Sequence, residues 1–207
     1  ATGKGGFERN LSAGEIVAQF LALRREAHTQ GRRLCTLVFM GMGEPLLNYK
    51  NVLKSIERIT APDGLGMSPR RITVSTAGVA KGIRQLGDDN VKFNLALSLH
   101  APTDEKRDRI MDINHSSNLE TVFEALSYFY EKTGNKITFE YILFDKFNDS
   151  IEDANYLMEL NKKVPSFINL IEYNRVEGVG FHKAKSEKRD AFVRHLRNKG
   201  INVAVRR

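Results

Sequence analysis

Short apolar runs rich in β-branched residues recur along the chain and alternate with longer amphipathic stretches. This alternation is typical of β/α units and predicts an α/β fold built on a parallel sheet. The runs are nearly continuous in apolar residues, as expected of parallel strands that are covered on both faces. Six strands are predicted, over Leu34–Met40, Arg71–Thr76, Phe93–Leu99, Ile137–Phe144, Phe167–Tyr173 and Asn202–Arg206.

Two helix starts are marked by a capping pattern, in which a serine precedes the helix and an acid follows three residues later. These pairs are Ser12 with Glu15 and Ser150 with Asp153. Two stretches also repeat apolar residues at helical spacing, and we expect these faces to pack on the sheet. They comprise Ile16, Val17, Phe20 and Leu21 in the first and Val122, Phe123, Leu126 and Phe129 in the second.

Length and composition predict one ordinary globular domain over residues 1–207. No window holds the roughly 18 consecutive apolar residues of a membrane span, and no leader pattern opens the chain, so we expect a cytoplasmic protein without a membrane partner. Cys35 is the single cysteine. It cannot by itself make a zinc or iron–sulfur site, and we expect it to be a small apolar filler of the first strand.

Positive charge is concentrated at one end of the sequence. Residues 181–207 hold nine Lys and Arg against two acids, whereas residues 1–180 hold 23 of each sign. A phosphate-bearing partner would suit this segment. An ordinary solvated helix face explains the same pattern equally well.

Polar groups follow the predicted strands at the points where five of them end. In β/α folds with parallel strands these ends meet at one rim, where ligands bind. A carboxylate beside glycines can accept hydrogen bonds from an ammonium group, and hydroxyls or an amide can bind a carboxylate, a ribose or a base edge. The groups are Glu44 after Gly43, Ser75, Ser98 with His100, Asp145 and Asn174, each of which taken alone is more often structural.

Four motifs, in order and at compatible spacing, resemble those of the RlmN/Cfr family of radical S-adenosylmethionine (SAM) adenine-C2 RNA methyltransferases. They are Phe39–Asn48 (FMGMGEPLLN), Arg70–Gly78 (RRITVSTAG), Ala96–Pro102 (ALSLHAP) and Asp145–Asp149 (DKFND). The opening residues Ala1–Phe7 resemble the segment that follows the family's cluster-binding cysteine loop. The resemblance covers essentially the whole chain.

The resemblance implies a partial (β/α) barrel of the radical SAM type, in which SAM binds a 4Fe-4S cluster held by three cysteines. It places Gly43 and Glu44 at the amino end of SAM, with Ser75, Ser98, Leu99, His100 and Asn174 as further contacts. Around Asn174 the chain has Tyr173-Asn174-Arg175 where the family usually has tryptophan-asparagine-proline, so the loop shape differs there.

The family's catalytic and cluster cysteines have no counterpart in these 207 residues. We therefore assign no catalytic or metal-binding residue and expect this chain by itself to carry no cluster and to be inactive. The chain opens without methionine and stops on a predicted strand end, so we expect it to be truncated at both ends, with the first barrel strand missing. The strand Leu34–Met40 would then be an edge, and a dimer or larger assembly through that edge is expected.

Two other functions remain open. In the first, the chain is the core of another radical SAM or Fe-S redox enzyme that shares the barrel; the Ser98–Pro102 string (SLHAP) speaks against this function. In the second, it is a non-catalytic β/α-barrel RNA-binding module. The sequence does not distinguish ribosomal RNA from transfer RNA as the substrate, nor C2 from C8 as the methylated carbon. It leaves open whether SAM binds without the cluster.

Overall fold

A computed structural model describes residues 6–206; Ala1–Gly5 and Arg207 lie outside the described residues, and with them most of the segment expected to follow the cluster loop. Within the described range a six-stranded, all-parallel sheet has the order β1-β2-β3-β4-β5-β6. The strands are β1 (Leu37–Phe39), β2 (Ile72–Thr76), β3 (Asn94–Ser98), β4 (Ile137–Leu143), β5 (Ser166–Glu172) and β6 (Val203–Arg206). The α/β class and all six predicted strands are confirmed.

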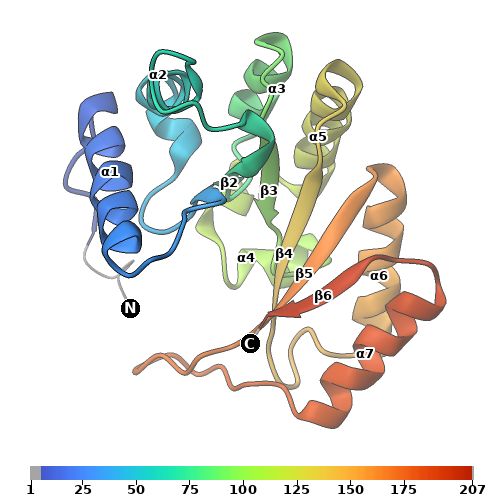
Figure 1. Ribbon diagram of the computed structural model, residues 1–207. Coiled ribbons are helices and arrows are strands. Elements are labelled where there is room, and N and C mark those ends of the chain that lie inside the picture. Colours follow the sequence, from blue (N-terminus) through green and yellow to red (C-terminus); the bar gives the residue numbers. More distant parts are fainter. Residues whose placement is uncertain (1–5, 207) are drawn as a thin grey trace.

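Helices connect successive strands, and Figure 1 shows the sheet running from β1, beside α1 and α2, to β6, beside α6 and α7. The α-helices are α1 (Ala13–Thr29), α2 (Tyr49–Thr60), α3 (Ala80–Asp88), α4 (Asp104–Asp108), α5 (Leu119–Thr133), α6 (Ile151–Lys163) and α7 (Ser186–Asn198). Short 3-10 turns are η2 (Pro45–Asn48), η3 (Pro69–Arg71) and η4 (Asp112–His115). No described helix combines the length and the apolar character that a membrane crossing needs.

Both predicted capping boxes are present and start α1 and α6. In α1 the Ser12 hydroxyl accepts from the Glu15 N–H while the Glu15 carboxylate accepts from the Ser12 N–H. Ser150 and Asp153 make the same pair of contacts at α6. The apolar face predicted for α5 is buried in the core as expected, and Phe20 of α1 is buried with it.

The two faces of the sheet differ, contrary to the expectation that both would be covered by apolar packing. Alternate strand residues, such as Leu97 and Phe139, belong to the same core cluster as the buried residues of the helices. Their neighbours Ser98 and Glu140 point to the opposite face because side chains alternate along a strand. Sequential strand order with right-handed crossovers puts all the connecting helices on one side, which leaves this second face without helices.

The first strand is shorter than predicted and begins at Leu37 rather than Leu34. Leu37 pairs with Ile72, so the residue before Leu37 lies opposite η3, where the chain turns and Pro69 has no N–H to donate. Cys35 therefore lies outside the strand and is exposed, with its Sγ donating to the carbonyl of Arg33 at 3.5 Å. The expectation that Cys35 fills the core was wrong.

We expect Phe123→Ala to lower the free energy of unfolding by about 3–5 kcal/mol, because it leaves a cavity in the main core cluster. Phe123 is 2% exposed and its ring meets Phe139 edge to face at 5.3 Å between centroids. Urea denaturation measures the loss. Leu23→Ala on the exposed side of α1 is the control and should change stability by less than about 0.5 kcal/mol; equal effects of the two changes would contradict the burial assigned to Phe123.

Candidate functional site at the carboxyl ends of the strands

The loop that follows β1 is held against the end of β2 by the carboxylate of Glu44. Its Oε2 accepts from the Ala77 N–H at 2.7 Å and its Oε1 accepts from the Leu46 N–H at 3.1 Å. Gly43 has a φ of +84°, a left-handed conformation that glycine adopts without strain. Each Glu44 oxygen keeps a further lone pair, so the carboxylate can still accept hydrogen bonds from a cation at this edge.

A close approach between this loop and α3 explains one glycine of the helix. A Cβ built on Gly82 would lie 2.8 Å from the Cβ of Leu46, which is buried directly after the Glu44 turn. Any side chain at Gly82 would push Leu46, and with it the Glu44 loop, away from the sheet.

The hydroxyls of Ser75 and Ser98 meet across neighbouring strands. Their Oγ atoms are 3.4 Å apart, and both residues lie on the sheet face that carries no helices. Ser75 is buried and Ser98 is partly exposed. The sequence prediction that these two side chains converge with Glu44 at one rim is therefore matched by the geometry, although their role as ligand contacts stays a prediction.

The His100 ring lies directly beyond β3 and acts as a hydrogen-bond acceptor. His100 has a φ of +56°, and its Nδ1 accepts from the Ile142 N–H at 3.2 Å. Burial lowers the pKa of His100 to about 4, and the positive charge of Arg107 also lowers it. A neutral ring is needed for the observed contact because a protonated Nδ1 cannot accept.

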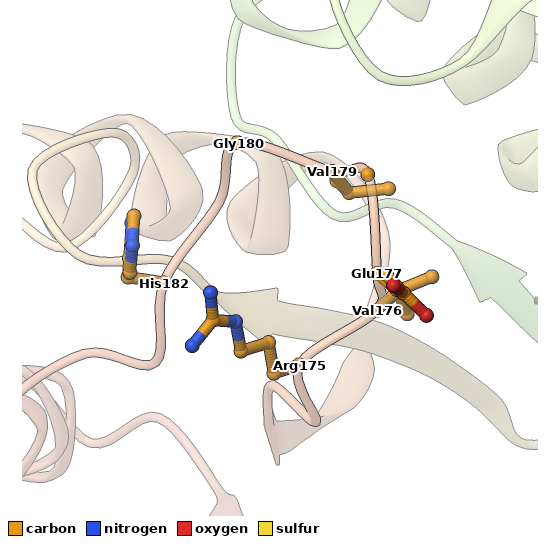
Figure 2. Close-up of a pocket in the computed structure, with 7 residues that line it drawn as sticks. Arg175, Val176, Glu177, Val179, Gly180 and His182 are labelled. Atoms are coloured by element: carbon orange, nitrogen blue, oxygen red, sulfur yellow. The ribbon is translucent and has the colours of Figure 1, made fainter.

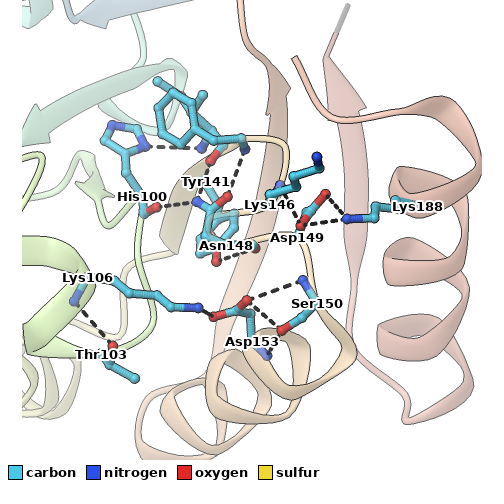
Figure 3. A network of polar contacts seen from close by, with 12 residues as sticks. His100, Thr103, Lys106, Tyr141, Lys146, Asn148, Asp149, Ser150, Asp153 and Lys188 are labelled. Atoms are coloured by element: carbon cyan, nitrogen blue, oxygen red, sulfur yellow. Dashed lines mark hydrogen bonds and ion pairs between the residues drawn. The ribbon is translucent and has the colours of Figure 1, made fainter. Parts of the chain in front are cut away.

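Asn148, in the fourth motif, holds the His100 backbone and was missed as a positioning residue. Its side chain is completely buried; Nδ2 donates to the carbonyls of His100 (2.7 Å) and Ile142 (2.8 Å), and Oδ1 accepts from the Phe144 N–H at 2.7 Å. Figure 3 shows this network, with the Tyr141 hydroxyl donating to the Asn148 carbonyl at 3.0 Å. The motif DKFND therefore closes the loop after β4 onto the end of β3.

A buried cation, Arg107, ties the ends of β2 and β3 together. Its guanidinium donates to the carbonyls of Ala77, Ser98 (3.3 Å) and Leu99 (3.2 Å), and to Asn114 Oδ1 at 2.6 Å. Burial lowers the pKa of Arg107 to about 10, so the side chain still carries its charge at neutral pH. No sequence pattern indicates this role, because an arginine among other charged residues is normally a surface residue.

Two of the predicted site residues differ from the others. The Leu99 side chain is completely buried, and its N–H and carbonyl are paired with the Glu140 carbonyl (3.0 Å) and with Arg107. Asn174 is exposed beyond the end of β5. Both assignments stay predictions.

An open hollow of about 700 Å³ follows Asn174 in the chain, in the loop between β5 and α7. Figure 2 shows its lining side chains, which are Arg175, Val176, Glu177, Val179 and His182. The Asp145 N–H donates to the His182 carbonyl at 2.9 Å, so the far side of the loop is tied to the end of β4. The hollow therefore lies next to the rim.

Part of the basic segment is neutralised within the chain. Lys183 and Arg189 both pair with Glu172, and Lys188 pairs with Asp149 at 3.1 Å and Asp145 at 3.8 Å. Residues 181–206 are thus not a uniform patch of available cations.

No protein-family model matches the chain. Among solved structures, it is similar to a radical SAM methyltransferase from Sphaerobacter thermophilus, with 37% identity, a TM-score of 0.95, and coverage of 99% of this chain and 60% of that one. Streptococcus suis SuiB bound to S-adenosylmethionine shares the fold alone, at 16% identity and a TM-score of 0.66, over 98% of this chain and 45% of that one. The fold is therefore that of the radical SAM proteins.

Sequence relatives indicate which family within the radical SAM class the chain resembles. The chain is 48% identical over 200 residues to the probable dual-specificity RNA methyltransferase RlmN of Christiangramia forsetii, covering 96% of the chain and 57% of the relative. It is 42% identical over 206 residues to the dual-specificity RNA methyltransferase RlmN of Nautilia profundicola, covering 100% and 58%. The resemblance is confirmed: the chain matches a segment of the RlmN family and spans somewhat more than half the length of these relatives.

We expect Arg107→Met to lower the free energy of unfolding by about 3 kcal/mol or more, because it leaves buried carbonyl oxygens and Asn114 Oδ1 without a donor. Thermal or urea unfolding measures the change. Arg109→Met is the matched control, since Arg109 is exposed and only stacks on Phe147, with 4.8 Å between its guanidinium carbon and the ring centroid; its loss should cost about 1 kcal/mol at most. Similar costs for both arginines would refute the clamp.

Between pH 6.5 and about 4 we expect His100 to make stability fall with falling pH. In that window the unfolded chain binds a proton at this ring and the folded chain does not, so acid favours unfolding. His100→Asn keeps an acceptor and tolerates the left-handed backbone, and should flatten the stability curve in this window. Direct NMR titration of the ring giving a pKa near 6.5 would contradict the assignment.

Proposed function

We propose that this chain is the SAM-binding part of a cytoplasmic radical SAM methyltransferase that methylates C2 of an adenine in 23S rRNA, transfer RNA or both. The observation that carries the proposal is the convergence of three family motifs on one rim, where Glu44, Ser75, Ser98 and His100 lie at the ends of β1, β2 and β3. Relatives named RlmN at 42–48% identity support the same activity. We further propose a single domain over residues 1–207, since one continuous sheet and one main core cluster span the described residues.

The residues of the rim fit SAM. Glu44 offers anionic lone pairs to an ammonium group, and the Ser75 and Ser98 hydroxyls offer donors and acceptors to the polar groups of an amino acid or a nucleoside. Asn174, exposed and next to the hollow, offers an amide. In enzymes of this kind SAM supplies a methyl group and a 5′-deoxyadenosyl radical; the part of this chain is to bind and orient it.

The residues do not fit a 4Fe-4S cluster. The sequence has one cysteine, and the described residues contain no group of three or more His, Cys, Asp or Glu placed to hold a metal ion. A cluster takes several cysteine thiolates, so it would need ligands from outside these 207 residues.

The two alternatives are less well supported. Streptococcus suis SuiB and a domain of the pyruvate-formate lyase-activating enzyme from Bacteroides vulgatus share the fold at only 16% identity. A non-catalytic RNA-binding module would depend on the basic segment, and three of its cations are already paired with acids of the same chain. A measurement of SAM binding at the rim distinguishes the two hypotheses, because the methyltransferase core would bind SAM and a non-catalytic RNA-binding module would not.

We expect SAM to bind this chain weakly, because a chain with one cysteine cannot hold the cluster whose iron chelates the amino and carboxylate groups of SAM in the family. Glu44→Gln keeps both the size and one acceptor oxygen but removes the charge, and should weaken binding about tenfold. Calorimetry or NMR titration measures this, with Glu57→Gln on the outer side of α2 as the control. Equal affinities for the wild type and Glu44→Gln would remove Glu44 from the site, and micromolar binding would show that the cluster matters little.

We also propose self-association through β1. Among the described residues this strand pairs only with β2, and Val38 (46% exposed), Met40 (44%) and Met42 (80%) leave apolar surface beside its open edge. We expect light scattering to show a dimer or larger assembly that Val38→Lys dissociates and Ile151→Lys, at an equally exposed position of α6, does not. A stable monomer at high concentration, or an assembly indifferent to Val38→Lys, would contradict the proposal.

A further inference from the structure

A row of polar side chains crosses the sheet on the face without helices. Ser98 of β3 is in register with Glu140 of β4, which is in register with Asn169 of β5. Register partners in a parallel sheet point to the same side, so the three side chains are neighbours. Ser75 extends the row to β2 through its 3.4 Å contact with Ser98. The row therefore leads from the predicted SAM contacts into the middle of the sheet.

Glu140 is the member of this row whose hydrogen bonding is incomplete. It is 3% exposed; its Oε1 accepts from Asn169 Nδ2 at 2.9 Å, whereas its Oε2 is buried without a partner in the described structure. Burial raises the pKa of Glu140, while the Asn169 hydrogen bond and the charge of Arg206 act in the opposite direction. A buried oxygen without a hydrogen-bond partner costs about 1–3 kcal/mol. This cost indicates that a bound molecule supplies the missing partner of Glu140 Oε2.

The chemistry of the row limits what that group is. Within the described residues no second carboxylate lies in a metal-binding group with Glu140, and the nearby Arg206 charge disfavours a cation. As a carboxylate oxygen, Glu140 Oε2 accepts hydrogen bonds, so the missing partner is a hydrogen-bond donor. Both side chains suit a base edge with an exocyclic amino group, because Asn pairs with N6 and N7 of adenine and acidic side chains accept from exocyclic amino groups such as N4 of cytosine.

We propose that Glu140 and Asn169 bind the amino-bearing edge of an adenine ring, with Glu140 Oε2 accepting from the exocyclic N6. This deepens the proposed function and rests on it, because both SAM and the target nucleotide of that reaction contain adenine. Two apolar neighbours on this face suit a flat ring: Phe167, in register with Thr138, and Ile142 lie two residues before and two residues after the level of Glu140, and both are partly exposed. Because Glu140 is buried, a ligand reaches its Oε2 only after a neighbouring side chain shifts. Arg206, which is exposed at the end of the same face, is one side chain that has room to move.

The test compares adenosine with inosine, which carries a carbonyl oxygen in place of the N6 amino group, by NMR titration of the 207-residue chain up to millimolar concentrations. We expect adenosine to bind at least about fivefold more tightly than inosine. In Glu140→Gln, Asn169 still donates to the remaining oxygen, so the amide nitrogen faces the ligand and the preference should disappear or invert toward inosine. Thr138→Val, on the same face, is the matched control and should keep the preference.

A second measurement does not depend on the variant's folding. The carboxyl carbon resonance of Glu140 in the wild-type chain should move with adenosine and stay in place with inosine. S-adenosylhomocysteine against its inosine analogue, and an adenosine-containing RNA oligomer against its inosine counterpart, then identify the source: discrimination in the first pair assigns the edge to SAM, and in the second alone to the target base.

Three results would overturn the inference. Binding that Ser75→Ala or Ser98→Ala weakens but whose adenosine preference survives Glu140→Gln would remove Glu140 and leave the proposed function intact. Equal binding of adenosine and inosine to the wild type would do the same. No response to any adenosyl ligand at the rim or at Glu140 would overturn both the inference and the proposed SAM site.

Discussion

The buried guanidinium of Arg107 is the contact on which the rim depends. Two adjacent parallel strands have carbonyl groups at their carboxyl ends that no longer pair within the sheet, and buried carbonyls need donors. Arg107 supplies them for Ala77, Ser98 and Leu99 at once. The cost of burying its charge is offset through Asn114, whose amide donates to the carboxylates of Asp104 (2.9 Å) and Asp108 (2.6 Å). Arg107 thereby holds the backbone at the ends of β2 and β3, where Ser75, Ser98 and His100 lie.

The sheet was predictable because its strands are short, apolar and separated by well-marked helices. The number of strands and their places along the chain, both capping boxes and the apolar face of α5 follow from local patterns. The difference between the two sheet faces does not. Residues such as Ala96, Ile142 and Phe167 are apolar on the helix-free face, so they hide the alternation that Ser98, Glu140 and Asn169 would otherwise reveal.

The candidate site was predictable in its membership and not in its internal bonding. Motif resemblance and the rule that ligands gather at strand ends select Glu44, Ser75, Ser98 and His100. That Glu44 also accepts from the Ala77 amide, or that Asn148 holds His100 in a left-handed backbone, depends on contacts between residues 33 or 48 positions apart. Such contacts have no periodic signal in the sequence. Cys35 shows a different error. The apolar run predicts a strand that already includes Cys35, whereas pairing with β2 begins only at Leu37 because η3 precedes β2.

The sequential strand order has a consequence for how the chain reaches this structure. Each strand pairs only with its predecessor and its successor among the described strands, so every sheet contact closes a loop of one β/α unit. A loop of one unit costs less entropy to close than a loop that spans several units. A nascent chain could thus add one unit at a time as it leaves the ribosome, with each completed unit serving as the template on which the next one docks.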